Sequence, residues 1–231
     1  MKEGVSQLVR RGVAAALLSA ALLALGILPL WKALAIAVLA IAVHVLWPEG
    51  RRPPGALVMQ RGAAIIGPDI LGFVLFAFFL ALPVWMGRGE NTEGIHASAL
   101  FVWPLLIAPL VILWNAAASS CLSVVVGAES LDLRRIGSHV TLPWGAMAGW
   151  RRWRRGLPRF LRGLAPFLSP AAAGAVLLAR DSTGIEIELR DGRRIRLPRE
   201  GFETAEAHIL RALAERDIRP LNGTTTGRIH R

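Results

Sequence analysis

The sequence is poor in the residues that build disulfides, metal centres and catalytic sites. Its one cysteine, Cys121, cannot form a disulfide within the chain, and the five histidines are scattered without the spacing of metal ligands. No glycine-rich phosphate loop and no nucleophilic serine elbow is present. Glu186 and Glu188 alternate along a predicted strand, which is typical of a solvated sheet face rather than of an acid–base pair. We therefore expect no enzyme activity, no cofactor and no metal.

Lysine and acidic residues are also scarce, and the charge is unevenly distributed. The 231 residues are 54% apolar with a net charge of +11, whereas a soluble domain is about 45–50% apolar. Residues 119–231 contain nineteen arginines, no lysine and eleven acidic residues. This usage is typical of a GC-rich bacterial genome. A basic half beside an apolar half indicates contact with anionic lipid headgroups or a cytoplasmic location, with nucleic acid as the general alternative.

Four apolar stretches predict a helical membrane domain over residues 1–118. About 20 residues of helix cross the roughly 30 Å hydrocarbon layer. The predicted spans are residues 12–31, 33–47, 70–86 and 99–118. The first resembles a signal peptide but lacks a small-x-small cleavage site before a polar chain, so we expect it to be retained. We expect His44 to reach the membrane interface and Asp69 to cap the third helix.

These stretches contain no carboxylate and no lysine. Transporters and channels place polar groups at mid-membrane depth, so the sequence predicts an anchor rather than a conduit. The N-terminal segment, the loop at residues 48–68 and the C-terminal half are basic, while the connection at residues 88–97 is acidic; Lys32 in the first turn opposes this pattern. The positive-inside rule then places both termini in the cytoplasm, in a multi-pass protein of a bacterial inner membrane. We expect residues 56–66 to lie along the membrane surface.

The second half changes to short alternating segments with turn signals, which predict strands. The segments are VVVGAESLDLRR, SHVTLPWGAMAGW and GIEIELRDGRRIRLP, where Asp191-Gly192 predicts a two-residue hairpin turn. A strand is also predicted over residues 175–180. FETAEAHILRALAERD then predicts an amphipathic helix over residues 204–216, and residues 220–231 predict a flexible tail.

In this order, the segments resemble the bacterial pleckstrin-homology-like (PH-like) family. The resemblance implies a PH-like cytoplasmic domain over residues 119–219, with antiparallel strands capped by one α-helix. Bacterial proteins of this kind often couple such a domain to a few membrane helices. Two features depart from the family: only six of its usual seven strands can be assigned, and residues 150–170 form a long insertion.

The insertion interleaves arginine with tryptophan, phenylalanine and leucine. This composition favours a membrane interface, where each basic residue near an anionic surface contributes about 1 kcal/mol. A solvated or protein-packed loop is the main alternative, and aromatic-interleaved nucleic-acid binding is a weaker one. The candidate lipid-interface residues are Arg151, Arg152, Trp153, Arg154, Arg155, Arg159 and Arg162.

Two functions are compatible with this organisation. The first is a non-enzymatic membrane-anchored adaptor, whose PH-like domain docks a partner protein or supports a membrane complex at the cytoplasmic surface. The second is a sensor or handler of anionic lipids. We expect the membrane, anionic lipids and a membrane-protein partner as contacts, and no nucleic acid. A transporter or an enzyme component built on the helices would need polar intramembrane residues, which the predicted spans lack.

Overall fold

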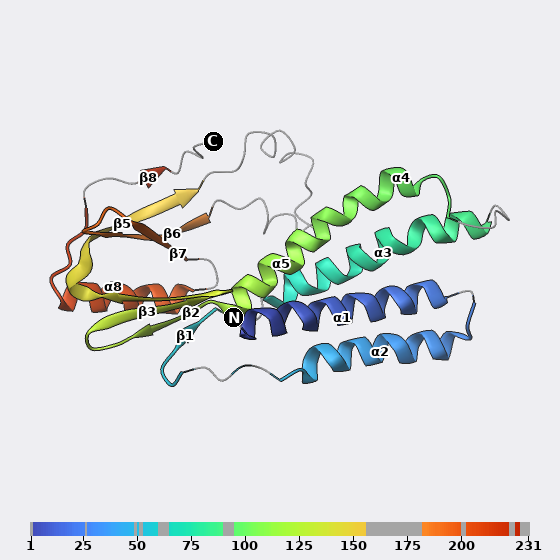
Figure 1. Ribbon diagram of the computed structural model, residues 1–231, viewed down its shortest axis with the longest axis horizontal. Helices are drawn as coiled ribbons and strands as arrows, with labels where there is room; N and C mark the ends of the chain where they lie inside the picture. The colour runs from blue at the N-terminus through green and yellow to red at the C-terminus, as the bar shows by residue number, and fades with distance from the viewer. Residues whose placement is uncertain are drawn as a thin grey trace. The chain divides into compact units, whose positions relative to one another are not determined.

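The chain forms two compact units. The computed structural model describes residues 2–25, 27–48, 50, 53–59, 65–89, 95–155, 182–199, 202–221 and 225–226. The first unit comprises Met1–Arg51 and Ile65–Cys121, and the second comprises Arg52–Ala64 and Leu122–Arg231. Figure 1 shows the helices of the first unit and the sheets of the second. The second unit therefore includes part of the loop between the second and third apolar stretches.

Within the described ranges, the helical unit has three helices that are long and apolar enough to cross a membrane. The candidate spans are Glu3–Ala24, Gly67–Arg88 and Ala99–Cys121. The corresponding elements are α1 (Lys2–Ala24), α3 (Gly67–Gly89) and the consecutive helices α4 (Ala99–Val102), η2 (Trp103–Leu106) and α5 (Ile107–Cys121). The remaining apolar helix, α2 (Leu30–Leu46), has only 17 residues. Three of the four predicted spans thus have full spanning length.

Several helix boundaries differ from the sequence prediction. Helix α1 begins at Lys2 and ends at Ala24, rather than spanning residues 12–31, so Arg11 lies inside the helix. Helix α2 begins at Leu30 rather than at Ala33. Helix α3 begins at Gly67, which places Asp69 in its first turn. In the fourth stretch Pro104 lies at the start of the 3₁₀ segment η2, consistent with the missing backbone N–H of proline.

Small residues bring the helices of this unit close together. Alanines on α1, α3 and α5 are almost fully buried, among them Ala14, Ala81 and Ala116. At Gly72 of α3, an added Cβ would lie 2.7 Å from the Leu113 side chain of α5. Close backbone approach through small residues is the usual way in which helices pack in a membrane. Helix α2 packs along α1, and α3 packs against both α1 and α5.

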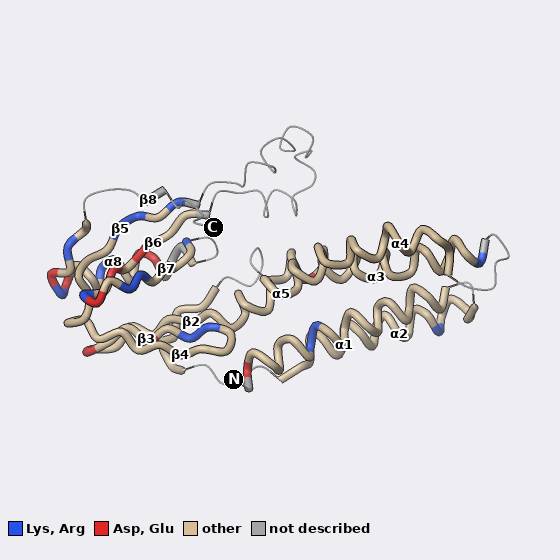
Figure 2. The backbone as a smooth tube through the Cα atoms, turned by 45° about the horizontal axis from the view of Figure 1, so that its top comes forward, with Lys and Arg blue, Asp and Glu red and all other residues tan. Residues whose placement is uncertain are grey.

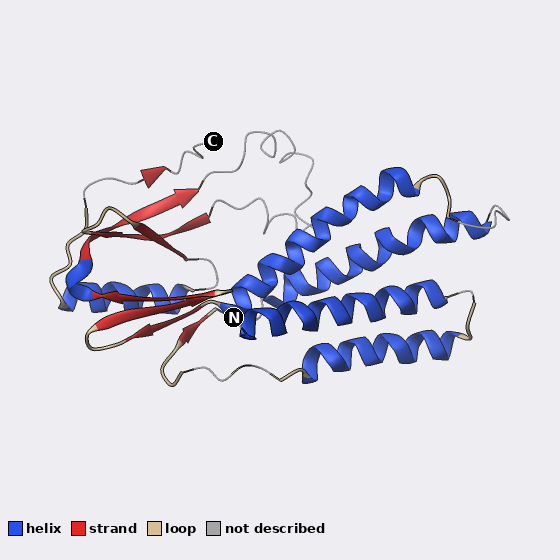
Figure 3. Ribbon diagram, in the orientation of Figure 1, coloured by secondary structure: helices blue, strands red, loops and turns tan. Residues whose placement is uncertain are grey.

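In its described residues, the second unit has two four-stranded sheets and one α-helix (Figure 3). The first sheet has the order β1-β2-β3-β4, and the second has the order β7-β6-β5-β8. The strands of the first sheet are β1 (Leu57–Val58), β2 (Ser123–Val126), β3 (Ser130–Arg135) and β4 (Ser138–Pro143). After the 3₁₀ turn η3 (Trp144–Ala146), the second sheet contains β5 (Met147–Arg155), β6 (Ser182–Leu189), β7 (Arg194–Pro198) and β8 (Thr225–Thr226). The helix is α8 (Glu203–Glu215).

The pairing is antiparallel throughout, except that β8 runs parallel to β5. The hairpin predicted at Asp191-Gly192 is confirmed, with Ile187 opposite Ile195, but its connection is longer than the predicted two-residue turn: Glu188 pairs with Arg194, and Gly192 has a φ of 82°. Left-handed backbone of this kind favours glycine. The predicted strand at residues 175–180 lies outside the described residues. Within the predicted tail, Thr225–Thr226 forms β8.

One apolar core joins both sheets to α8. Leu131 and Leu133 come from the first sheet, Ile187 from the second, and Ile209 and Leu213 from the helix. The C-terminal end of α8 is held by Arg216, which donates to the Gly127 and Ala128 carbonyls and lies 4.3 Å from the ring centroid of Trp144. The β-rich unit therefore has a hydrophobic core of its own.

Strand β1 was not expected. Residues 56–66 were predicted to lie along a membrane surface, but Leu57 and Val58 pair with Val124 and Ser123 at the edge of the first sheet. The next residue, Met59, is 8% exposed and belongs to the core. The prediction is therefore wrong for residues 57–59, because Leu57 and Val58 pair with β2 and Met59 is buried in the core of the β-rich unit.

Candidate functional site

The helical unit contains a buried polar cluster. Arg11 and Gln7 lie on α1, Asp69 on α3, Ser120 on α5 and His44 on α2. These helices alternate in direction along the chain, so positions near the start of α1 and α3 meet positions near the end of α2 and α5. Arg11 and Asp69 are each 2% exposed. A buried charged group is stable only when it is paired and hydrogen-bonded.

Every N–H group of the Arg11 guanidinium has an acceptor. Nε and Nη2 donate to the two carboxylate oxygens of Asp69 at 2.7 and 2.9 Å, a bidentate ion pair. Nη2 also donates to Ser120 Oγ at 2.8 Å. Nη1 donates to Gln7 Oε1 at 2.9 Å and to the Gln7 carbonyl at 3.3 Å. Because no donor of this guanidinium is left for an external ligand, the cluster ties three helices together rather than offering a binding group.

His44 extends the cluster to the fourth helix. Its Nε2 lies 3.3 Å from Asp69 Oδ2, and its ring meets Phe73 edge-on with 5.1 Å between the centroids. Its Nδ1 is buried and has no hydrogen-bond partner. The imidazole thus turns inward to α3, and the expectation that it reaches the membrane interface stays a prediction.

Asp69 was also expected to act as a helix cap. Instead, its two oxygens accept from Arg11, and one of them faces His44. Its place in the first turn of α3 still favours a carboxylate there, since the N-terminus of a helix carries partial positive charge. The sequence did contain one signal for this cluster: Gln7, Arg11 and Ala15 are spaced by four residues and so share one face of α1.

The predicted lipid-interface residues lie partly on strand β5. Trp150–Arg155 are not a loop but pair in register with Ser182–Ile187 of β6, which puts Arg151 and Trp153 on one face of the strand and Arg152 and Arg154 on the other. The start of the predicted insertion is therefore regular sheet. Arg159 and Arg162 lie outside the described residues, and of Arg155 only the backbone is described.

The described members of this set separate into two groups. Arg152 and Arg154 are exposed. Trp153 is only 9% exposed, and the Arg196 guanidinium lies 5.6 Å from its ring centroid. Arg151 donates from Nε to Glu186 Oε1 at 2.8 Å. Arg151 and Trp153 thus contact charged side chains of the neighbouring strands, while Arg152 and Arg154 are exposed to solvent.

Glu186 lies at the centre of an ion-pair network on this sheet. It is fully buried, so the expected solvated face is wrong at this position. Arg196 Nε donates to its Oε2 at 2.6 Å, while Arg151 occupies the other oxygen. Arg151 and Arg194 also approach Glu188 Oε2, at 3.2 and 3.5 Å. Figure 2 shows these charges along β5, β6 and β7.

Burial raises the pKa of Glu186, but the hydrogen bonds from Arg196 and Arg151, with their charges, outweigh it and hold the pKa below its ordinary value of 4.5. The carboxylate is therefore ionised at neutral pH. Its two arginine partners are held in place by it, which fixes the positions of basic side chains on this sheet.

Among the described residues, no group of three or more His, Cys, Asp or Glu side chains is arranged to hold a metal ion. Comparison with known proteins adds no assignment.

No family profile, no curated protein and no solved structure matches this chain.

Any function must therefore be argued from the chain's own geometry, and the PH-like resemblance stays a prediction.

Proposed function

We propose that the chain is a non-enzymatic, membrane-anchored docking protein. Its apolar helices hold it in the bilayer, and its β-rich unit presents an arginine-bearing surface to a partner protein. The observation that carries the proposal is the division into two compact units, one apolar and helical and one with its own core and a network of ordered arginines. The PH-like assignment of the second unit is part of this proposal; its support is that the strands other than β8 pair antiparallel and that α8 follows β7.

The pairing of β1 with β2 supports a specific topology. Leu57 and Val124 pair directly, so both must lie on the same side of the membrane. Helices α3 and α4–α5 lie between them in the chain and must therefore cross and return. If α2 also crosses, its 17 residues give about 25 Å, at the short end of spanning helices. Both termini then lie on one side, which the positive-inside rule makes the cytoplasmic side of a bacterial inner membrane.

The polar cluster supports an anchoring role for the helices. A conduit needs polar groups that can bind and release an ion or substrate. Arg11 instead uses all its donors on Asp69, Ser120 and Gln7. Such saturation favours fixed helix packing over transport.

The partner that best fits the β-rich unit has an acidic surface. Arg152 and Arg154 are exposed on β5, and the side chain of Arg194 on β7 is 49% exposed. Charge complementarity of this kind sets association rate and specificity. A partner of the same basic character would be repelled.

Site-specific photo-crosslinking in intact cells tests the docking proposal. A photoreactive amino acid at position 152 or 194 should yield one dominant protein adduct of stoichiometric yield, and that protein should in turn retrieve this chain. Charge reversal by R154E should weaken the adduct from position 152, while the same probe at the exposed position 34 of α2 should not yield it. A chain that remains alone and monomeric in mild detergent, with no such adduct, contradicts the proposal.

Anionic lipid is the second candidate ligand of this surface. The exposed pair Arg152 and Arg154 favours it, since both belong to the run of arginines predicted to meet headgroups. The full chain is needed for the test, because β1 comes from the loop before α3. In nanodiscs containing anionic lipid, β5 should exchange amide hydrogen more slowly than in zwitterionic nanodiscs, and salt should abolish the difference. Unchanged exchange, or the same protection after Arg→Gln substitution at 152 and 154, excludes lipid contact here.

A further inference from the structure

We propose that His44 is a pH-sensitive latch of the helical unit, whose neutral imidazole holds α2 against α3 and releases it when the ring takes up a second proton. This inference is independent of the docking proposal and concerns only the four helices. It rests on the geometry of the buried polar cluster: His44 Nε2 lies 3.3 Å from Asp69 Oδ2, the ring meets Phe73 edge-on, and Nδ1 is buried. Histidine is the side chain whose charge ordinarily changes between about pH 5 and 8.

The contact with Asp69 fixes where the proton of the neutral ring lies. Both oxygens of Asp69 accept from Arg11, so the carboxylate offers His44 only an acceptor. Nε2 must therefore carry the ring proton, and Nδ1 is left unprotonated. Within the described part of the chain, Nδ1 has no hydrogen-bond partner. The docked geometry thus uses the single N–H of a neutral imidazole and provides no acceptor for a second one.

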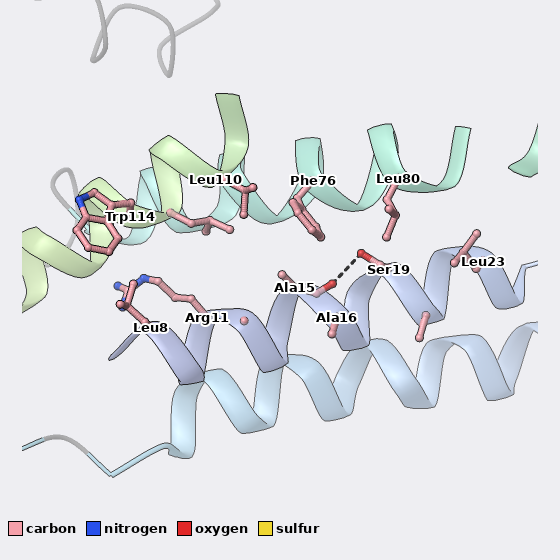
Figure 4. Close-up of a pocket in the computed structure, with 13 residues that line it drawn as sticks. Leu8, Arg11, Ala15, Ala16, Ser19, Leu23, Phe76, Leu80, Leu110 and Trp114 are labelled. Carbon is pink, nitrogen blue, oxygen red and sulfur yellow. Dashed lines mark hydrogen bonds between the residues drawn. The ribbon is translucent and has the colours of Figure 1, made fainter. Parts of the chain in front are cut away.

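A second proton would turn Nδ1 into a buried donor. Such a donor loses its hydration without replacement, and the loss is larger when the group is charged. The space beyond Arg11 supplies no polar substitute: Phe76 and Leu110 line it (Figure 4), and the hydroxyl of Ser19 donates to the Ala15 carbonyl at 2.8 Å. The cluster is therefore bounded by hydrocarbon on that side.

The two charges that face His44 balance each other. Asp69 on α3 attracts a protonated ring, but Arg11 on α1 donates to the same Oδ2 at 2.9 Å and repels it. Arg11 and Asp69 carry one positive and one negative charge, so a proton on His44 would leave the buried cluster with one positive charge in excess. An uncompensated buried charge is strongly unfavourable.

The remaining charged residues of the four helices do not supply the missing negative charge. Arg10 of α1 adds positive charge at this end, and the one carboxylate of α1, Glu3, lies beside Gly50, beyond the end of α2. Lys32 in the first turn of α2 and Arg88 in the last turn of α3 are at the opposite end. Helix α5 contributes Ser120 and contains no charged residue; its one titratable group is the buried Cys121 thiol. The docked position is therefore compatible with the neutral ring, whereas the charged ring is better hydrated outside it.

The place of His44 in α2 allows the ring to leave. The helix ends two residues later, at Leu46, and the His44 side chain is 19% exposed. Helix α2 stays attached to α1, along which it packs, and Trp47 Nε1 donates to Ser6 Oγ at 2.9 Å. Loss of the His44 contact thus frees α2 from α3 without detaching it from α1. The contact is present near pH 8 and is lost as the pH falls toward about 5.

Hydrogen exchange of the full chain in lipid nanodiscs, at about pH 7.5 and about pH 5.5, tests the latch. After correction for the intrinsic pH dependence of amide exchange, the last two turns of α2 should exchange several-fold faster at the acidic pH. Helices α1 and α3 should keep their protection, because the Arg11–Asp69 pair remains in place. Equal protection of α2 at both pH values, or stronger protection at the acidic one, overturns the proposal.

H44Q supplies the matched comparison. The glutamine amide can donate to Asp69 but takes up no proton, so α2 should lose its pH dependence. H139Q, at a histidine on β4 whose side chain is 53% exposed, should keep the wild-type response. A pH response that survives in H44Q shows that another group is responsible and overturns the proposal.

NMR of the wild-type chain with labelled histidine side chains decides the matter if H44Q fails to fold. The His44 signal is recognised by its contact with the Phe73 ring. It should report uptake of the second proton over the same pH interval in which α2 loosens. Proton uptake without loosening of α2, or loosening while His44 stays neutral, overturns the proposal.

Discussion

Arg11 joins three helices of the helical unit through one buried side chain. Its side chain is 2% exposed and links α1 to α3 and α5. Removing one partner of a buried ion pair leaves an uncompensated charge, which is far more destabilising than removing both. The same reasoning applies to Glu186 in the β-rich unit, where one buried carboxylate holds two arginines.

The first prediction concerns the Arg11–Asp69 pair. R11L and D69L should each lower the free energy of unfolding by about 3–5 kcal/mol, because each leaves the other charge buried. The double variant R11L/D69L should lose less than the more damaging single one. Equilibrium denaturation in mild detergent, followed by circular dichroism, measures this cycle. R88L removes an exposed arginine and serves as the control; strictly additive losses would contradict the prediction.

The second prediction concerns the acid stability of the β-rich unit. The pKa of Glu186 is lower in the folded chain than its ordinary value of 4.5. Its contribution to stability is therefore fully present above about pH 4.5 and is lost as the pH falls through the folded value. E186Q should flatten the fall in stability between neutral and acidic pH, measured by denaturation at each pH. E215Q, at an exposed site, should keep the wild-type slope, and an unchanged slope in E186Q would refute the assignment.

At the scale of elements, α2 is attached to the helical unit through few polar contacts. It packs along α1, Trp47 at its end donates to Ser6 Oγ at 2.9 Å, and His44 reaches Asp69 and Phe73 on α3. The contact of His44 with Asp69 and Phe73 therefore links α2 to α3, although α2 packs along α1 rather than along α3.

The third prediction follows from this link. H44L removes the contact with Asp69 but leaves the Arg11–Asp69 pair, so α2 should loosen by about 1 kcal/mol, a roughly five-fold increase in its hydrogen exchange. Exchange in α1 and α3 should change little. V45A, at an outward position of α2, is the control. Faster exchange in all four helices would show that His44 supports the whole cluster rather than α2.

Local signals in the sequence predicted the secondary-structure elements better than they predicted which residues contact one another. The Asp191-Gly192 turn and the alternation after Gly184 were sufficient to predict the β6–β7 hairpin. Strand β1 could not be predicted, because two residues are too few to show a strand's alternation. Their partners in β2 also come after α3 and α4–α5 in the sequence. Arg11 was predicted to lie outside the first span, because a hydropathy scale scores arginine as strongly polar whether or not its charge is paired. Its partner Asp69 is 58 positions away in the sequence. The exposed arginines of β5 were predicted as a group, but which of them face outward depends on pairing with β6.

At the scale of the whole molecule, the two units have separate cores, and β1 belongs to the second although it precedes α3 in the chain. A substitution in one core should therefore lower the stability mainly of the unit that contains it. The Met59 side chain offers a clear test, because it is buried in the β-rich core but reaches it from the loop between helices.

The fourth prediction is that M59A destabilises the β-rich unit by about 2–5 kcal/mol, as large-to-small core substitutions do, while the helical unit keeps its stability. Hydrogen exchange should rise in β2 and β3 and stay unchanged in α1 and α3. L34A, on an exposed face of α2, is the control. A uniform rise in both units would mean that they unfold as one body.

The position of β1 also constrains how the chain is made. Leu57 and Val58 leave the ribosome well before Ser123 and Val124, with which they pair. At about 5–20 residues per second, this edge strand waits roughly 3–13 seconds for its partner. If α3 and α4–α5 cross the membrane as proposed, they are inserted during that interval. Biogenesis of the β-rich unit is therefore coupled in time to insertion of the last two apolar helices, and a pause in that insertion prolongs the exposure of an unpaired strand.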